Sequence, residues 1–101
     1  MPITIVRYTT RPEASQTNAD LISQVFAELA SEGRDDLRYA AFRLGEQEFL
    51  HLSLAQTQPS PLHGIAAFRR FREGVEQRCI EAPRSLSAVL IGQHRLPDLL
   101  K

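Results

Sequence analysis

Residues 37–54 read LRYAAFRLGEQEFLHLSL, two largely apolar runs on either side of the polar segment Gly45-Glu46-Gln47. A three-residue connection that starts with glycine suits an antiparallel hairpin, because glycine adopts the backbone conformations of a tight turn at no steric cost. The sequence therefore predicts two paired strands, at residues 37–44 and 48–54.

The segment before this hairpin predicts one strand and one helix. Residues 3–10 (ITIVRYTT) are rich in β-branched side chains, which pack well on a pleated sheet, and Pro12 follows them. A stripe of apolar residues then recurs at helical spacing. The stripe consists of Leu21, Ile22, Val25, Phe26 and Leu29. We expect Thr17 to cap the start of this helix and Gly33 to end it in a left-handed conformation.

The segment after the hairpin predicts a second helix and a last strand. Ser60 supplies a capping hydroxyl and Pro61 suits the first helical turn, while Pro83 prevents continuation much beyond residue 80. The apolar face of this helix consists of Ile65, Phe68, Phe71, Val75 and Cys79. Residues 86–91 (LSAVLI), running on to residue 95, form the expected strand.

The element order is β-α-β-β-α-β, and the 101 residues suit one domain. Right-handed crossovers in this order place both helices on the same face of the sheet. We therefore predict an α+β, ferredoxin-like domain over residues 1–101, with a four-stranded antiparallel sheet and two helices on one face.

The predicted sheet has two faces but helices for only one. Side chains alternate along a strand, so Leu50, Leu52 and Leu54 share one face, which we expect to meet the helices. The other face then carries Phe49 together with His51 and Ser53. Because that face also keeps apolar residues, it needs a further cover, and a second copy of the chain is the simplest one. We therefore expect a homodimer.

Charge and cysteine content exclude several classes of protein. Lys+Arg and Asp+Glu are both 12, and a net charge of +0 disfavours binding to nucleic acid or to an anionic membrane. No apolar run approaches the length of about 20 residues that crosses a bilayer. The single Cys79 excludes an intrachain disulfide and a cysteine-rich zinc site. The expected location is the cytoplasm.

Four segments carry a resemblance across the whole chain: ITIVRYTTRPE, FRLGEQEFLHL, PLHGIAAFRRFREGVEQRC and SAVLIGQHR. In this order and spacing the chain resembles the dimeric α+β barrel proteins, particularly the branch named after antibiotic biosynthesis monooxygenases. The resemblance implies two ferredoxin-like subunits that pair their sheets into a barrel. Enzymes of this kind oxidise aromatic compounds without metal or flavin, or open a haem ring. They use Asn, Trp, Tyr and His near the pocket, whereas this chain has no Trp and only Asn18.

His51 and Tyr39 form the expected acid–base pair. A histidine with an ordinary pKa of about 6.5 transfers protons in both directions near neutral pH, which suits a phenolic or dihydroxy-aromatic substrate. The competing interpretation is a hydrogen-bonded histidine within a dimer interface. Tyr8 and Tyr39 can each bring a hydroxyl to an apolar cavity, or serve only as packing.

Arg72 and His63 are the remaining candidates for ligand binding. Arg72 falls inside the apolar arc of the second helix, so it either extends to water along its aliphatic stem or binds a carboxylate or phenolate. His63 lies in the first turn of that helix and either reaches a pocket mouth or stays on the surface. His94 is expected at the end of the sheet, and Cys79 as an inert packed thiol. The three histidines lack metal-ligand spacing, so no metal or other cofactor is expected.

Two functions follow from these residues. One is a cofactor-independent, monooxygenase-like enzyme that acts on a small aromatic metabolite. The other is a non-catalytic homodimeric module that binds a small ligand or only associates. A pocket of a few hundred cubic ångströms around His51 and Arg72, with converging polar groups, would favour the enzyme.

Overall fold

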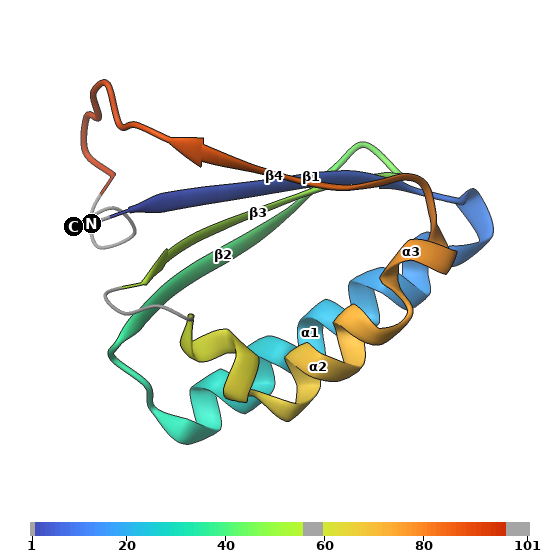
Figure 1. Ribbon diagram of the computed structural model, residues 1–101, viewed down its shortest axis with the longest axis horizontal. Coiled ribbons are helices and arrows are strands. Elements are labelled where there is room, and N and C mark those ends of the chain that lie inside the picture. Colours follow the sequence, from blue (N-terminus) through green and yellow to red (C-terminus); the bar gives the residue numbers. More distant parts are fainter. Residues whose placement is uncertain (1, 56–59, 97–101) are drawn as a thin grey trace.

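The computed structural model describes residues 2–55 and 60–96 and has the predicted βαββαβ order (Figure 1). The four strands form one antiparallel sheet in the order β2-β3-β1-β4. The strands are β1 (Ile3–Thr10), β2 (Leu37–Leu44), β3 (Glu48–Ala55) and β4 (Cys79–Ala88). The helices are α1 (Ser15–Glu32), α2 (Ala66–Glu73) and α3 (Val75–Arg78), with short 3-10 turns at Pro12–Ala14 and Pro61–Gly64. The ferredoxin-like fold is confirmed.

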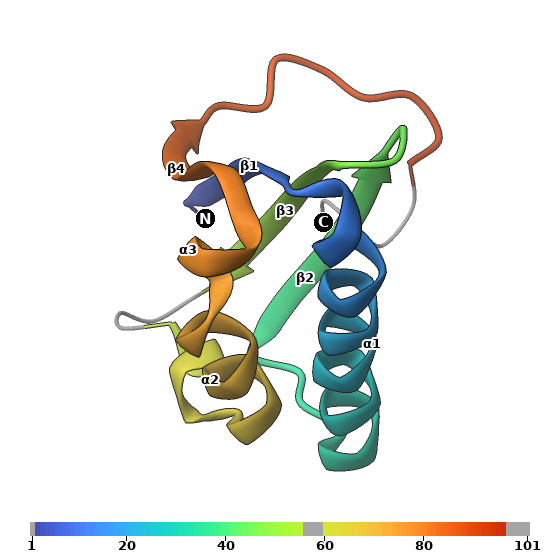
Figure 2. The same ribbon diagram turned by 90° about the vertical axis from the view of Figure 1, so that its right-hand side faces the viewer.

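Both long helices cover the same face of the sheet, as Figures 1 and 2 show. The core between them contains Val25 of α1, Phe71 of α2, Ile65 just before α2 and Phe49 of β3. No described helix packs on the opposite face. Within the same residues, no helix is long and apolar enough to cross a membrane.

The structure reverses the expected orientation of β3. Phe49 is only 2% exposed and stacks on Tyr8, and the ring of His51 lies 5.3 Å from that of Phe71 in α2. The helices therefore meet Phe49 and His51, and the leucines of β3 face the other way. Both faces of β3 carry apolar residues. The alternation of side chains therefore separates the leucines from Phe49 and His51, but it does not tell which of the two groups faces the helices. The larger aromatic rings fill the space beneath the helices.

The first helix begins earlier than predicted and ends where predicted. Thr17 does not cap it, because the chain already turns at Pro12–Ala14 and α1 starts at Ser15. The Ser15 hydroxyl is buried against the Thr10 hydroxyl at 2.7 Å, which ties the helix start to the end of β1. Gly33 has a φ of 60°, and this left-handed conformation ends the helix as predicted.

The second helix is interrupted, whereas the sequence predicted a continuous one. Ser60 caps the 3-10 turn at Pro61–Gly64, because its hydroxyl accepts the N–H of Leu62, and α2 follows this turn. Gly74 then separates α2 from α3, so residues beyond it leave the helical register of α2. Cys79 consequently opens β4 and is not part of a helix.

The last strand also differs from its prediction, because β4 spans Cys79–Ala88 and contains Pro83. The proline is tolerated because β4 is an edge strand and the register shifts there, with Arg7 opposite Arg84 but Thr9 opposite Glu81. Pairing stops at Ala88, which lies opposite Ile3 at the start of β1. Residues 89–95 therefore have no strand of their own chain beside them, and the predicted continuation does not form.

Candidate active site

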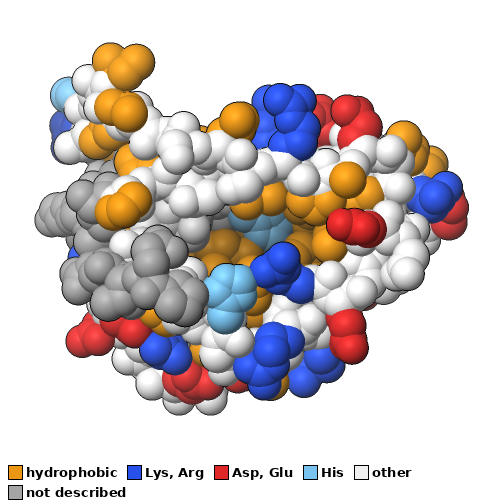
Figure 3. All heavy atoms as spheres, viewed as in Figure 1, with side chains coloured by type: hydrophobic (Ala, Val, Ile, Leu, Met, Phe, Trp, Pro, Cys, Tyr) orange, Lys and Arg blue, Asp and Glu red, His pale blue; other side chains and the backbone are white. Residues whose placement is uncertain are grey.

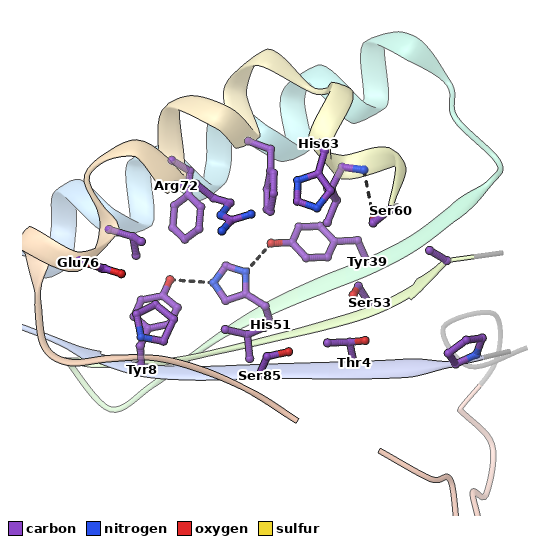
Figure 4. Close-up of a pocket in the computed structure, with 18 residues that line it drawn as sticks. Thr4, Tyr8, Tyr39, His51, Ser53, Ser60, His63, Arg72, Glu76 and Ser85 are labelled. Atoms are coloured by element: carbon purple, nitrogen blue, oxygen red, sulfur yellow. Dashed lines mark hydrogen bonds between the residues drawn. The ribbon is translucent and has the colours of Figure 1, made fainter. Parts of the chain in front are cut away.

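A cavity of about 530 Å³ opens between the helix layer and the sheet. Figure 3 shows the hollow, with hydrophobic and histidine side chains inside it and basic side chains at its edge. Its helix side is apolar, with Leu62, Phe68, Phe71 and Val75. Its sheet side adds the hydroxyls of Thr4, Ser53 and Ser85 (Figure 4). The volume is typical of sites for small molecules.

The cavity brings together the five residues that the sequence singled out. They are Tyr8, Tyr39, His51, His63 and Arg72. Strand alternation explains three of them, because Tyr8, Tyr39 and His51 point to the helix side of β1, β2 and β3. The expected location of His51 in an interface between subunits is wrong, since the ring lies beneath the helices of its own chain. The roles assigned to these residues stay predictions.

His51 lies between the two tyrosines and bonds to both. Its Nε2 is 2.8 Å from the Tyr8 hydroxyl, and its Nδ1 contacts the Tyr39 hydroxyl (Figure 4). The imidazole is 5% exposed. Its ring centroid lies 5.4 Å from that of Tyr8 and 5.8 Å from that of Tyr39. Packing and hydrogen bonds therefore hold the ring in one orientation.

Burial controls the ionisation of this trio. Removal from water lowers the pKa of His51 to about 4, because the charged imidazolium is poorly solvated there. Burial likewise raises the pKa of Tyr8 and of Tyr39 above the ordinary value of a phenol. At neutral pH the site therefore contains a neutral imidazole between two neutral phenols.

Two further residues reach this trio and were not selected from the sequence. Asn18 of α1 is fully buried, and its Nδ2 donates to the Tyr8 hydroxyl at 2.9 Å. Arg78 of α3 donates from Nε to Asn18 Oδ1 at 3.0 Å and from Nη2 to the Phe71 carbonyl. Asn18 could have been recognised because it extends the stripe of Ile22 and Val25 by one helical turn. Arg78 could not, since the break at Gly74 decides where it points.

Arg72 and His63 lie at the mouth of the cavity. Arg72 extends from α2 over the opening, and the exposed His63 ring packs edge-on against Phe68 (Figure 4). Within residues 2–55 and 60–96, the Arg72 guanidinium has no ion-pair or hydrogen-bond partner, while the backbone carbonyl of Arg72 accepts the Gly74 N–H. Glu76, also exposed, lines the same cavity from α3 and supplies an opposite charge nearer Tyr8.

The other candidates lie away from the cavity. His94 is exposed beyond the end of β4. Cys79 is a free, buried thiol at the start of β4, and burial raises its pKa, which keeps it protonated. In the part of the chain that the structure describes, no three His, Cys, Asp or Glu side chains gather in a metal-binding group.

Solved structures with the same fold provide the comparison with known proteins. No family model matches the sequence, and no curated protein matches it. A protein of unknown function from Nitrosomonas europaea is 11% identical, with a TM-score of 0.70, over 92% of this chain and 91% of its own. A candidate antibiotic biosynthesis monooxygenase from Caulobacter crescentus is 12% identical, with a TM-score of 0.70 over 90% of each chain.

A more distant match concerns an enzyme. SnoaB, a cofactor-independent oxygenase from Streptomyces nogalater, is 10% identical, with a TM-score of 0.58 over 96% of this chain and 98% of its own. At these identities the similarity lies in the arrangement of strands and helices. The chain therefore has the ferredoxin-like α+β fold of the antibiotic biosynthesis monooxygenase-like proteins.

Proposed function

We propose that this chain is a cofactor-independent, monooxygenase-like enzyme that acts on a small planar phenol or quinol. The observation that carries the proposal is the His51–Tyr39 pair at the inner wall of a cavity of about 530 Å³. Phe68 and Phe71 supply apolar surface for an aromatic ring, and the hydroxyls of Thr4 and Ser53 suit its oxygen substituents. His51 and Tyr39 act as the acid–base pair beside the reacting oxygen.

A quinol can supply every electron that the reaction needs. One oxygen atom of O2 enters the ring, and the other is reduced to water by the two electrons that the quinol loses. The products are a hydroxyquinone and water, and the atoms balance without a further reductant. The protein's contribution is to hold the ring, orient its oxygen against Tyr39 and control the proton there.

A non-catalytic small-ligand-binding module is the second candidate. It is favoured by one observation: within the described residues, every buried polar side-chain atom already has a hydrogen-bond partner. A network that is satisfied in this way also stabilises a core without any chemistry. Turnover separates the two functions, whereas ligand binding alone does not.

Oxygen consumption tests the enzymatic proposal. Protein free of flavin and metal is mixed with a naphthalene-type quinol, and O2 uptake is followed together with hydroxyquinone formation. We expect His51→Ala to lower turnover by about 10², because a positioned acid–base group contributes about that factor. His94→Ala, which changes the same residue type outside the cavity, is the control. Binding of the quinol without uptake by the unmodified protein would support the ligand-binding module.

The functional unit that we propose is a homodimer formed through the uncovered face of the sheet. That face carries Ile5, Leu52 and Leu86 side by side in the strand register, with Phe42 and Leu50 next to them. Phe42 and Leu86 are exposed in the single chain. A second copy would cover this face and remove its apolar surface from water.

The segment after β4 supports the same assembly. Val89 is 87% exposed and Ile91 is fully exposed, although their sequence pattern predicts a strand. Because β1 of the same chain begins only at Ile3, opposite Ala88, a strand beyond Ala88 needs a neighbour from another chain. The proposed partner sheet supplies that neighbour.

A further inference from the structure

Five side chains form one continuous line of hydrogen bonds from α3 to the cavity. Arg78 Nε bonds to Asn18 Oδ1 at 3.0 Å, and Asn18 Nδ2 bonds to the Tyr8 hydroxyl at 2.9 Å. The Tyr8 hydroxyl bonds to His51 Nε2 at 2.8 Å, and His51 Nδ1 bonds to the Tyr39 hydroxyl. Figure 4 shows the last two bonds, with Tyr39 at the cavity end of the line.

Arg78 sets the direction of every bond in this line. All the guanidinium nitrogens are donors, so Asn18 must turn its carbonyl oxygen to Arg78 and its amide nitrogen to Tyr8. The Tyr8 oxygen thus accepts from Asn18, and its single hydrogen goes to His51 Nε2. A neutral imidazole carries one N–H, which is then at Nδ1 and donates to the Tyr39 oxygen.

The hydroxyl hydrogen of Tyr39 is consequently left for the cavity. Among residues 2–55 and 60–96, the Tyr39 hydroxyl has no hydrogen-bond partner other than His51. With the imidazole N–H at Nε2 instead, the Tyr8 oxygen would accept from both Asn18 and His51, and its own buried hydroxyl hydrogen would have no acceptor among the described residues. That arrangement costs one buried hydrogen bond. The Tyr39 hydroxyl can therefore donate a hydrogen bond to a ligand in the cavity, whereas the bond directions in the line disfavour the transfer of a proton from the ligand to Tyr39.

The neighbouring charges favour a ligand of the same kind. Arg72 extends over the cavity near Tyr39, and the described part of the chain gives its guanidinium no carboxylate partner (Figure 4). Glu76 lies at the other side of the mouth and is exposed to water, which screens its charge. A negatively charged oxygen beside Tyr39 thus meets a hydroxyl donor and a nearby cation.

We propose that the cavity selects its aromatic ligand as the phenolate, with the Tyr39 hydroxyl donating to the phenolate oxygen and Arg78 acting as the positioning residue. This inference rests on the proposed function in so far as the cavity holds a phenol or quinol. Binding then releases the phenolic proton to the solvent. It also assigns Tyr39 the role of the donor in the acid–base pair and gives His51 the role of orienting that donor.

A coloured phenol tests this preference directly. 4-Nitrophenol is yellow only as the phenolate, so absorbance reports its ionisation, and calorimetry reports its binding, at pH values on both sides of its pKa. We expect the bound probe to favour the phenolate at least tenfold more than the free probe does. This preference equals a fall of at least one unit in the pKa of the bound phenol.

Two variants separate the donor from the residue that positions it. Tyr39→Phe removes the donor and should abolish most of the pKa shift while the probe still binds. Arg78→Gln should weaken the shift and also change the tautomer of His51 from Nδ1–H to a mixture, which ¹⁵N NMR of the ring distinguishes. Arg70→Gln, the same change at an exposed arginine of α2, should leave both measurements unchanged.

The outcomes distinguish this inference from the proposed function. If the probe binds but ionises as it does in water, or less readily, the inference is wrong and the proposed phenol site stands. The same holds if His51 in the unmodified protein is the Nε2–H tautomer. If neither the phenol nor the phenolate binds, the cavity is not a phenol site, and both proposals are wrong.

Discussion

At the scale of single residues, the main feature is a histidine buried beneath the helices. Leaving water disfavours the charged form of His51, and the two tyrosines satisfy both ring nitrogens. The Asn18 amide donates a hydrogen bond to the Tyr8 hydroxyl, and Arg78 donates one to the Asn18 carbonyl oxygen. Each buried polar group between Arg78 and the cavity therefore has a hydrogen-bond partner. The energetic effects of this network should therefore appear in stability as well as in function.

The first prediction concerns stability and pH. The pKa of His51 is about 4 in the folded protein and 6.5 ordinarily, so the unfolded chain alone binds this proton between those values. The free energy of unfolding should be highest above pH 6.5 and fall by on the order of 3 kcal/mol down to pH 4. Urea unfolding across this range measures it. His51→Gln should lack this part of the slope, and equal slopes in both proteins would contradict the prediction.

The second prediction concerns the Tyr8 hydroxyl. Tyr8→Phe leaves Asn18 Nδ2 and His51 Nε2 without a partner in a buried location, which should lower the free energy of unfolding by about 1–3 kcal/mol. Tyr39→Phe is the matched control and should cost less, because Tyr39 borders the open cavity and water can replace its hydroxyl. An equal loss in both variants would show that the network does not stabilise the core in this way.

At the scale of elements, the two long helices are joined by a side chain as well as by packing. Glu28 of α1 accepts the N–H of Ala67 at 2.9 Å and that of Ala66 at 3.2 Å, the first amides of α2. These amides have no partner within the helix, and the carboxylate also favours the positive end of the helix dipole. The start of α2, and with it the helix side of the cavity, is thus anchored to α1.

The third prediction follows from this contact. The hydrogen bond from Ala67 lowers the pKa of Glu28, so its stabilising effect is complete above the ordinary pKa of the carboxyl and is lost as the pH falls through the lowered value. Glu28→Gln should lower the melting temperature at pH 7 and have little effect at pH 2. Glu73→Gln, at an exposed glutamate, is the control. A deficit of the same size at both pH values would contradict a role of the charge.

At the scale of the whole molecule, the two faces of the sheet differ in what covers them. The helices bury Phe49 and His51, while Leu50 and Leu52 lie on the opposite face, where no described helix packs. Apolar surface on both faces of a four-stranded sheet is expected when both are covered. The proposed dimer places its interface on the leucine face, opposite the cavity.

The fourth prediction tests which face is which. Leu52→Asp should give a folded monomer, because its charge stays in water once the partner is lost. Phe49→Asp should prevent folding, since it places a carboxylate in the core. Light scattering after gel filtration measures the mass, with twice 11.4 kDa expected for the unmodified chain. Circular dichroism reports folding. A mass of one chain for the unmodified protein would contradict the dimer.

The amino-acid sequence by itself determined the element order, the hairpin, the apolar helix stripes and the end of helix α1 at Gly33. These follow from local preferences, because periodicity and turn chemistry act within a few residues along the chain. It also selected His51, Tyr39, Tyr8, His63 and Arg72, whose chemistry differs from that of their apolar neighbours. Strand pairing then brought Tyr8, Tyr39 and His51 together, and the packing of the second helical segment on the sheet added His63 and Arg72 to the same cavity.

The tertiary structure alone decided which face of β3 is inside, where the second helix breaks and what Arg78 contacts. Both faces of β3 are apolar, so only the fit of Phe49 and His51 beneath the helices distinguishes them. Gly74 lets the chain leave α2, and the turn that follows carries Arg78 back onto Phe71 and Asn18. Such choices depend on contacts between residues far apart in the chain, and local sequence patterns do not contain them.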